Sequence, residues 1–154
     1  MGLNHYTELL YYLKGILESD PLVNTVTQGE LDMVSLNKMD IYMLCHIVIN
    51  EPLFTNGQTV GFNVEVLCCD VVDLNKEVNE DKFFKNDNEV DVLNETLAVL
   101  NRFWTKLNQD FERKGITTDD NVTLQQWLND KDNAVGYVLP FTVQMPNKKM
   151  NLCQ

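Results

Sequence analysis

The most regular pattern of apolar and polar positions in the chain runs through residues 87–115. Its apolar side chains recur at spacings of three and four, which is typical of one face of an α-helix: Val90, Leu93, Leu97, Leu100, Trp104, Leu107 and Phe111. Asn86, Asp87 and Asn88 are candidate N-caps, and Gly115 can adopt the left-handed conformation that ends a helix. At a rise of 1.5 Å per residue, about 26 residues give a helix roughly 39 Å long, enough to lie across a whole sheet.

This apolar stripe is wider than the seam of a coiled coil, because Val92, Val99 and Phe103 lie beside it. We therefore expect a helix that packs on a core. Three of its central residues are expected to be buried: Leu97, Leu100 and Trp104.

A shorter helix is predicted for residues 5–19, where apolar side chains again recur at helical spacing. It should end at Asp20, because the residue before a proline, here Pro21, avoids the helical conformation. A composition rich in Val and Thr predicts a strand at residues 22–28, and residues 29–40 are interpreted as a loop or a ragged hairpin arm.

Two strong strands are predicted next, at residues 41–49 and 60–72, where apolar residues are nearly continuous or alternate with polar ones. Turn-forming residues lie between them, at positions 51–52 (Glu-Pro) and 56–57 (Asn-Gly). These segments therefore predict a long β-hairpin.

A second hairpin is predicted from residues 121–128 and 134–145. Pro140 removes a ladder donor from its second arm, so that arm should be a sheet edge or carry a bulge at that point. The remaining segments are an acidic linker at residues 73–88 and an extended C-terminal arm at residues 146–154. We expect a single α+β domain over residues 1–154, in which an antiparallel sheet of the long hairpin plus the C-terminal hairpin packs against one long helix and a shorter N-terminal helix.

The charge balance argues against a protein that grips nucleic-acid phosphates. The chain has 12 Lys and Arg residues against 23 Asp and Glu, with a net charge of −11 and a pI near 4.4. The acidity favours simple solubility, and the alternative is a surface that repels nucleic acid or meets a basic partner. No signal peptide and no membrane-spanning run are expected, so we expect the chain to be made in a reducing cytoplasm.

Metal and cofactor sites are not expected from the sequence. The four cysteines form no CxxC pair, only two histidines accompany them, and Cys45, Cys68 and Cys69 lie in apolar strand-like runs typical of buried structural thiols. His46 is expected to be a structural histidine within the sheet. A calcium loop starting at Asp73 is not favoured, because Val78 stands where the loop needs glycine.

The sequence lacks the catalytic patterns GxSxG, GxxxxGK[ST], GxGxxG after a strand and HExxH. The acidic residues fall mainly in predicted turns and in the linker, although a site built from dispersed carboxylates is possible in principle. We therefore expect the chain not to be an enzyme.

Four stretches carry a resemblance to a known family: HYTELLYYLKGILESDPLVNTVT, TVGFNVEVLCCDVVD, DNEVDVLNETLAVLNRF and DNAVGYVLPFTVQMPNKKMNLC. In these stretches and in the order of its predicted elements, the chain resembles the tail-terminator and head-tail joining proteins of tailed bacteriophages. It is similar in particular to ring proteins in the neck of crAss-like phages of Bacteroides hosts. The linker and the C-terminal arm are longer than a minimal tail terminator needs.

The resemblance implies a structural virion protein without cofactor or metal. Its subunits would form a closed ring, commonly of six or twelve copies, because a head-to-tail contact repeated around a closing rotation makes a ring. Its partners would be further copies of itself, the portal, and other neck-ring or tail proteins, with DNA passing through the bore and no membrane contact. The alternative is a cytoplasmic α+β adaptor or regulator that binds one protein partner.

Three features of the sequence are candidates for a subunit interface. They are the aromatic pair in the charged linker, the arm with its proline, and the basic C-terminal segment of an otherwise acidic chain. We expect the lysines of that segment to meet linker acids of the next copy, with the phenylalanines as apolar anchors. The candidate residues are Phe83, Phe84, Glu77, Glu80, Asp81, Pro140, Pro146, Lys148 and Lys149.

Overall fold

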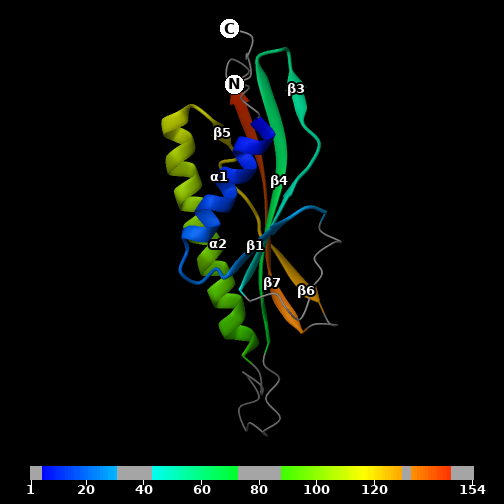
Figure 1. Ribbon diagram of the computed structural model, residues 1–154, viewed down its shortest axis with the longest axis vertical. Helices are drawn as coiled ribbons and strands as arrows, with labels where there is room; N and C mark the ends of the chain where they lie inside the picture. Colours follow the sequence, from blue (N-terminus) through cyan, green and yellow to red (C-terminus); the bar gives the residue numbers. More distant parts are fainter. Residues whose placement is uncertain (1–4, 31–42, 73–87, 130–132, 147–154) are drawn as a thin grey trace, which may run out of the picture.

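The computed structural model describes residues 5–30, 43–72, 88–129 and 133–146 (Figure 1). Within these ranges the chain is an α+β unit in which two helices lie on one face of a seven-stranded sheet, so the predicted fold class is confirmed. The elements in chain order are α1 (His5–Ser19), β1 (Thr25–Gln28), β2 (Leu44–Ile49), β3 (Leu53–Thr55), β4 (Thr59–Val71), α2 (Glu89–Lys114), β5 (Thr117–Thr118), β6 (Gln125–Asn129) and β7 (Ala134–Pro146).

Two long strands form the middle of the sheet. β4 and β7 have 13 residues each and pair antiparallel over their full length, from Thr59 opposite Pro146 to Val71 opposite Ala134. The strand order is β1-β2-β4-β7-β5, while β3 pairs with β4 and β6 pairs with β7. Both predicted hairpins are therefore present, and their two long arms join them into one sheet.

One strand pair corrects the prediction of a wholly antiparallel sheet. β1 and β2 run parallel, with Thr25 opposite Leu44 and Gln28 opposite Ile47. A parallel pair needs a crossover of about a dozen residues or more, and the connection through residues 29–43 is long enough to provide it. The first strand also begins at Thr25 rather than at residue 22.

The terminal charges and the C-terminal end of α2 follow the sequence signals, whereas Asn88, at the N-cap position, makes no side-chain capping hydrogen bond. Glu89 and Asp91 lie in the first turn, and Arg113 with Lys114 in the last, each at the helix end whose partial charge is opposite to its own. Gly115 ends the helix in the left-handed conformation at φ 68°, and its N–H donates to the carbonyl of Phe111.

The buried face of α2 is rotated from the one that the sequence predicted. Leu100 is buried at 1% exposure, but Leu97 is 43% exposed and Trp104 is only partly buried, so the expectation for Leu97 is wrong. The flanking row faces the sheet instead, and it includes Thr96, whose hydroxyl is satisfied by the carbonyl of Val92 at 2.9 Å. The buried residues are Val92, Thr96, Val99, Leu100, Phe103, Leu107 and Phe111.

The main core lies between the helices and one face of the sheet. It contains Leu9, Leu13 and Leu17 of α1, the sheet-facing row of α2, and alternate residues of β2, β4 and β7. A smaller apolar cluster lies on the opposite face of the sheet, where Trp127 of β6 packs against four buried residues: Leu44, Leu67, Cys69 and Val138. No helix within the described ranges is long and apolar enough to cross a membrane.

The C-terminal end of α1 is fixed to α2 by an ion pair. Both oxygens of Asp20 accept hydrogen bonds from Arg102, at 2.7 and 3.1 Å, and Asp20 Oδ1 also accepts the N–H of Leu22. Partial burial pushes the pKa of Asp20 upward, but the hydrogen bonds from Arg102 and Leu22 outweigh it and lower that pKa below its usual value. This pair helps to hold α1 across the middle of α2.

Pro140 lies in a strand that has neighbours on both sides, so the predicted sheet edge is wrong for β7 as a whole. At Pro140 itself, however, no described strand pairs with the outer side, because β6 pairs only as far as Val138 and β5 pairs only from Val143 onward. Thr142 directs its N–H to this side, where it donates to Asp119 Oδ2. Since strand residues alternate, the nitrogen of Pro140 faces the same way, and its register with β4 continues without a bulge.

Candidate functional site

The feature that a single subunit explains least is a short edge strand with two exposed apolar side chains. In β3, Leu53 is 65% exposed and Phe54 is 67% exposed. Leu53 lies opposite Gly61 of β4 and Phe54 opposite Val60, so the two side chains point to opposite faces of the sheet. Among the described strands, β3 pairs only with β4, which leaves its outer backbone edge open.

Local sequence explains why β3 forms. Asn56 and Gly57 both have positive φ, at 49° and 66°, and the N–H of Gln58 donates to the carbonyl of Thr55 at 2.9 Å. This is the turn geometry that an Asn-Gly pair favours between antiparallel strands. β2 ends at Ile49, so the N-terminal part of β4 pairs with β3 instead, and the β3–β4 hairpin extends to one end of the molecule (Figure 1).

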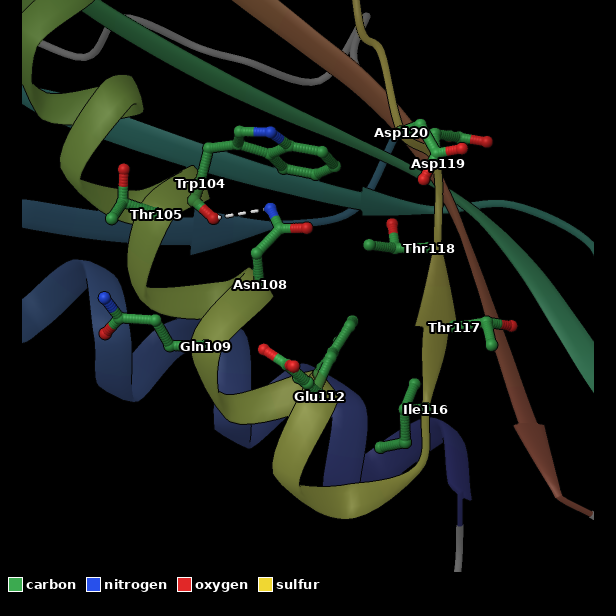
Figure 2. Close-up of a pocket in the computed structure, with 11 residues that line it drawn as sticks. Trp104, Thr105, Asn108, Gln109, Glu112, Ile116, Thr117, Thr118, Asp119 and Asp120 are labelled. Carbon is green, nitrogen blue, oxygen red and sulfur yellow. Dashed lines mark hydrogen bonds between the residues drawn. The ribbon is translucent and has the colours of Figure 1, made fainter.

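A second edge that no described strand covers lies on the other side of the same end of the sheet. β5 is the terminal strand in the sheet order, and it pairs with β7 through Thr117 opposite Gln144 and Thr118 opposite Val143. Residues of β5 and α2 line a cleft of about 630 Å³ between the two elements. Figure 2 shows Trp104 and Asn108 of α2 on one side of this cleft, with Thr118 on the other.

The cleft combines apolar and acidic groups. Trp104 forms its inner wall and makes an edge-to-face contact with Phe141 at 5.4 Å between ring centroids. Asn108 is held in place because its amide donates to the carbonyl of Trp104 at 2.7 Å. Glu112 and Asp120 line the cleft with exposed carboxylates, so the cleft is open, half apolar and negatively charged.

Asp119, at the edge of this cleft, links the segment after β5 to β7 by hydrogen bonds. Its carboxylate accepts the N–H of Thr142 at 2.7 Å and the hydroxyl of Thr142 at 2.8 Å. The hydroxyl of Thr118 donates to the carbonyl of Thr142 at 2.7 Å. These bonds fasten β5 to β7 where the ladder has no strand neighbour, which fixes the cleft wall.

His46 is held by hydrogen bonds within the sheet, and His5 is buried in the core region. His46 Nδ1 lies 2.7 Å from Thr27 Oγ1, and Nε2 lies 3.1 Å from the carbonyl of Gly29. This hydrogen bonding agrees with the sequence expectation for His46. His5 is 1% exposed, and neither of its ring nitrogens has a hydrogen-bond partner among the described residues.

Cys45 and Cys68 lie opposite each other in β2 and β4, and both are buried free thiols. The hydrogen bond with Cys45 and burial together raise the pKa of Cys68, and burial raises the pKa of Cys69 to about 12. Thiols held in their protonated form are poor nucleophiles. Within the described ranges, no three His, Cys, Asp or Glu side chains gather as a metal ion would require.

The structure describes two of the predicted interface residues. Pro140 borders a hollow beside Asp119, and Pro146 ends β7 opposite Thr59, the first residue of β4. The two are six positions apart on one strand and form no common site. The other predicted residues lie outside the described ranges: Phe83, Phe84, Glu77, Glu80, Asp81, Lys148 and Lys149.

Sequence reasoning missed Leu53 and Phe54. The signal was present as an apolar pair between two turn motifs, Glu-Pro at 51–52 and Asn-Gly at 56–57, but the whole segment was interpreted as a turn. In a comparison with known proteins, no family model matches the chain and no curated protein sequence matches it.

Proposed function

We propose that this chain is a structural subunit of a tailed bacteriophage, which associates with further copies of itself into a ring in the neck or tail. The observation that carries the proposal is the β3 edge strand with its exposed Leu53 and Phe54. Adjacent, largely exposed apolar side chains on an open strand edge are costly in a monomer, because such an edge invites pairing with another chain. A second copy would cover both the side chains and the edge.

The two open edges support a ring rather than a two-fold dimer. β3 and β5 are different surfaces at opposite sides of the sheet. A contact that joins different surfaces of successive copies is heterologous, and it closes into a ring when the rotation between copies allows it. Six or twelve copies is the expectation from the resemblance to phage neck proteins.

The charge of the chain is consistent with a conduit for DNA. The net charge of −11 favours repulsion of phosphates over adhesion, so a passing duplex would not be retained by the lining. The portal and other neck or tail rings would be the remaining partners, stacked above and below.

The proposal is tested in purified particles of the phage that encodes the chain. We expect mass spectrometry to detect the protein in tailed particles at about six or twelve copies per particle, the number expected for one ring. Replacing Leu53 and Phe54 together with serine should reduce its incorporation. The matched control is Leu128→Ser, because Leu128 is 58% exposed but lies in β6, on another part of the sheet.

Two outcomes would count against this proposal in different ways. Absence of the wild-type protein from purified particles would reject the virion role and favour the adaptor that binds one protein partner. Full incorporation of the double serine variant, with tails attached, would remove the β3 surface from ring assembly.

A further inference from the structure

The open edges of β3 and β5 lie at the same level of the sheet, because residues that face one another across neighbouring strands form a continuous row from one edge to the other. Leu53 is opposite Gly61, Gly61 is opposite Gln144, and Gln144 is opposite Thr117. One row therefore runs from one open edge to the other through four strands. The two edges are level with each other at one end of the subunit, so copies placed side by side would bring them together.

The strand directions are also compatible with pairing. β3 is antiparallel to β4, β4 is antiparallel to β7, and β7 is antiparallel to β5. β3 and β5 consequently run in opposite directions. If β3 of one copy lies beside β5 of the next, the new pair is antiparallel and continues the ladder of both subunits.

Side-chain alternation decides where Phe54 would go. Phe54 lies opposite Val60, and Thr118 lies opposite Val143. Val60 and Val143 both belong to the core beneath the helices, so Phe54 and Thr118 point to the helix side of the sheet. Val60 lies opposite Met145, and this row continues to Ile116, two residues before Thr118 and on the same side of the sheet. An incoming Phe54 level with Ile116 would therefore point toward α2.

The helix side of β5 is where the cleft lies. Trp104 and Ile116 line it, and Figure 2 shows Trp104 extending from α2 toward β5. A phenylalanine ring entering there would bury its exposed area against an indole ring, a pairing that adds to simple area burial. The cleft of about 630 Å³ is within the range that accepts groups of small-molecule size.

We infer that β3 of one copy pairs antiparallel with β5 of the next copy and inserts Phe54 into the cleft between α2 and β5. The occupant of the cleft is thus a second copy of this chain. This inference rests on the proposed self-association, and it specifies which two surfaces meet. Because β3 and β5 are both short, the Phe54 contact would supply much of the specificity of the pairing.

The test is disulfide trapping between Phe54→Cys and Ile116→Cys, the pair that the continued rows place opposite each other, with Cys153→Ser in every variant. Cys45, Cys68 and Cys69 are buried and remain as they are. The two engineered positions are three strand spacings apart within one chain, about 14 Å at roughly 4.8 Å per spacing. A disulfide needs Cα atoms within about 7 Å, so a bond between them must join two chains.

Two single variants, one carrying a larger tag, are mixed in equal amounts and oxidised. We expect the mixed dimer to exceed, by about tenfold or more, the product from Leu128→Cys with Ile116→Cys, because an ordered contact raises the effective concentration of the two thiols. The variant with both cysteines should give a ladder of dimers, trimers and larger species.

A mixed-dimer yield no higher than the Leu128 control would overturn the pairing, as would a product dominated by Phe54→Cys joined to itself. Either result leaves the virion role to be judged by particle composition. Conversely, efficient trapping of a protein absent from particles would keep this interface and reject the phage role.

Discussion

The hydroxyl of Tyr12 in α1 donates a hydrogen bond to Asp110 Oδ2 in α2 at 2.7 Å, across a sequence separation of 98 residues. The Tyr12 ring also stacks on Phe111, with 5.6 Å between centroids, and Lys114 Nζ lies 4.7 Å from its centre. Lys106 forms an ion pair with Asp110 at 3.3 Å. Tyr12 therefore connects the two helices by polar and apolar contacts together.

Replacing Tyr12 with phenylalanine should keep the stacking and remove the hydrogen bond. We expect a loss of about 1 to 2 kcal/mol in the free energy of unfolding at neutral pH, because the partly buried Asp110 carboxylate loses its hydroxyl donor. Urea denaturation measures the change. Tyr11→Phe is the control, since Tyr11 is 65% exposed, and it should change stability by less than about 0.5 kcal/mol.

The same bond gives Tyr12→Phe a pH signature. The hydrogen bond from Tyr12 is the main cause that lowers the pKa of Asp110 below its usual 3.8. A depressed folded-state pKa means that the stabilisation is complete above the unfolded pKa and is lost as the pH falls through the folded value. The difference between wild type and Tyr12→Phe should therefore shrink in acid below the usual pKa. A constant difference down to that range would show that the variant acts through packing.

The rotated face of α2 is tested by two leucine truncations in one helix. Leu100 is 1% exposed and Leu97 is 43% exposed. Leu100→Ala should cost about 2 to 5 kcal/mol as a large-to-small core change, whereas Leu97→Ala should cost less than about 1 kcal/mol. Thermal and urea unfolding of both variants decide the matter. Equal losses of stability in the two variants would instead support the buried face predicted from the apolar spacing, which includes both Leu97 and Leu100.

Replacing either of two glycines with alanine should change the stability of the protein in opposite directions. A Cβ on Gly136 would collide with the Cys68 carbonyl oxygen and come within 2.7 Å of Cys69 Cα, both in the backbone of β4. Gly136→Ala should therefore destabilise the sheet by about 3 kcal/mol or more. Gly15→Ala meets nothing within 4 Å in α1 and should stabilise by up to about 1 kcal/mol through helix propensity. A tolerated Gly136→Ala would contradict the close approach of β7 to β4.

Local patterns in the sequence were sufficient to predict the two helices and both hairpins, because each has a clear apolar period and clear end signals. Gly115 and the pair Asn56 and Gly57 carried positive φ values that other residues rarely adopt. The parallel pairing of β1 with β2 was not readable, since strand partners far apart in sequence leave no local signal. The face of α2 was misjudged for a related reason: two apolar rows were available, and only the position of the sheet chooses between them.

The candidate site was largely beyond the sequence. Leu53 and Phe54 form an apolar pair too short to count as a strand by period, and their exposure depends on where β2 ends. The cleft is lined by Trp104 from α2 and by Thr118 from β5. The turn between these two elements sets their relative position, and the apolar periodicity of the sequence does not predict the geometry of that turn. That the β3 edge is level with the cleft beside β5 follows only from the register of four strands, which the sequence does not show.

His46 provides a pH test of the sheet, because its pKa is lowered below 6.5 mainly by burial, against the raising effect of the Gly29 and Glu30 carbonyls. The unfolded chain therefore binds a proton at a higher pH than the folded chain does. The sign follows directly: the stabilisation is complete above about pH 6.5 and is lost as the pH falls from there toward the folded pKa.

His46→Gln should retain a donor toward the two carbonyls and lose the acceptor for the Thr27 hydroxyl, at a cost of about 1 kcal/mol at pH 7.5. Between pH 7.5 and 5.5 its stability should fall less than that of wild type, by at most about 1.4 kcal/mol for each unit of pKa difference. Urea unfolding at the two pH values measures both slopes. His5 is unchanged in the variant, and Asp20 and Asp110 titrate in stronger acid, so the difference in slope belongs to His46. Parallel slopes would mean that the imidazole is protonated equally in the folded and unfolded chains, and that burial at Thr27 and Gly29 does not favour its neutral form.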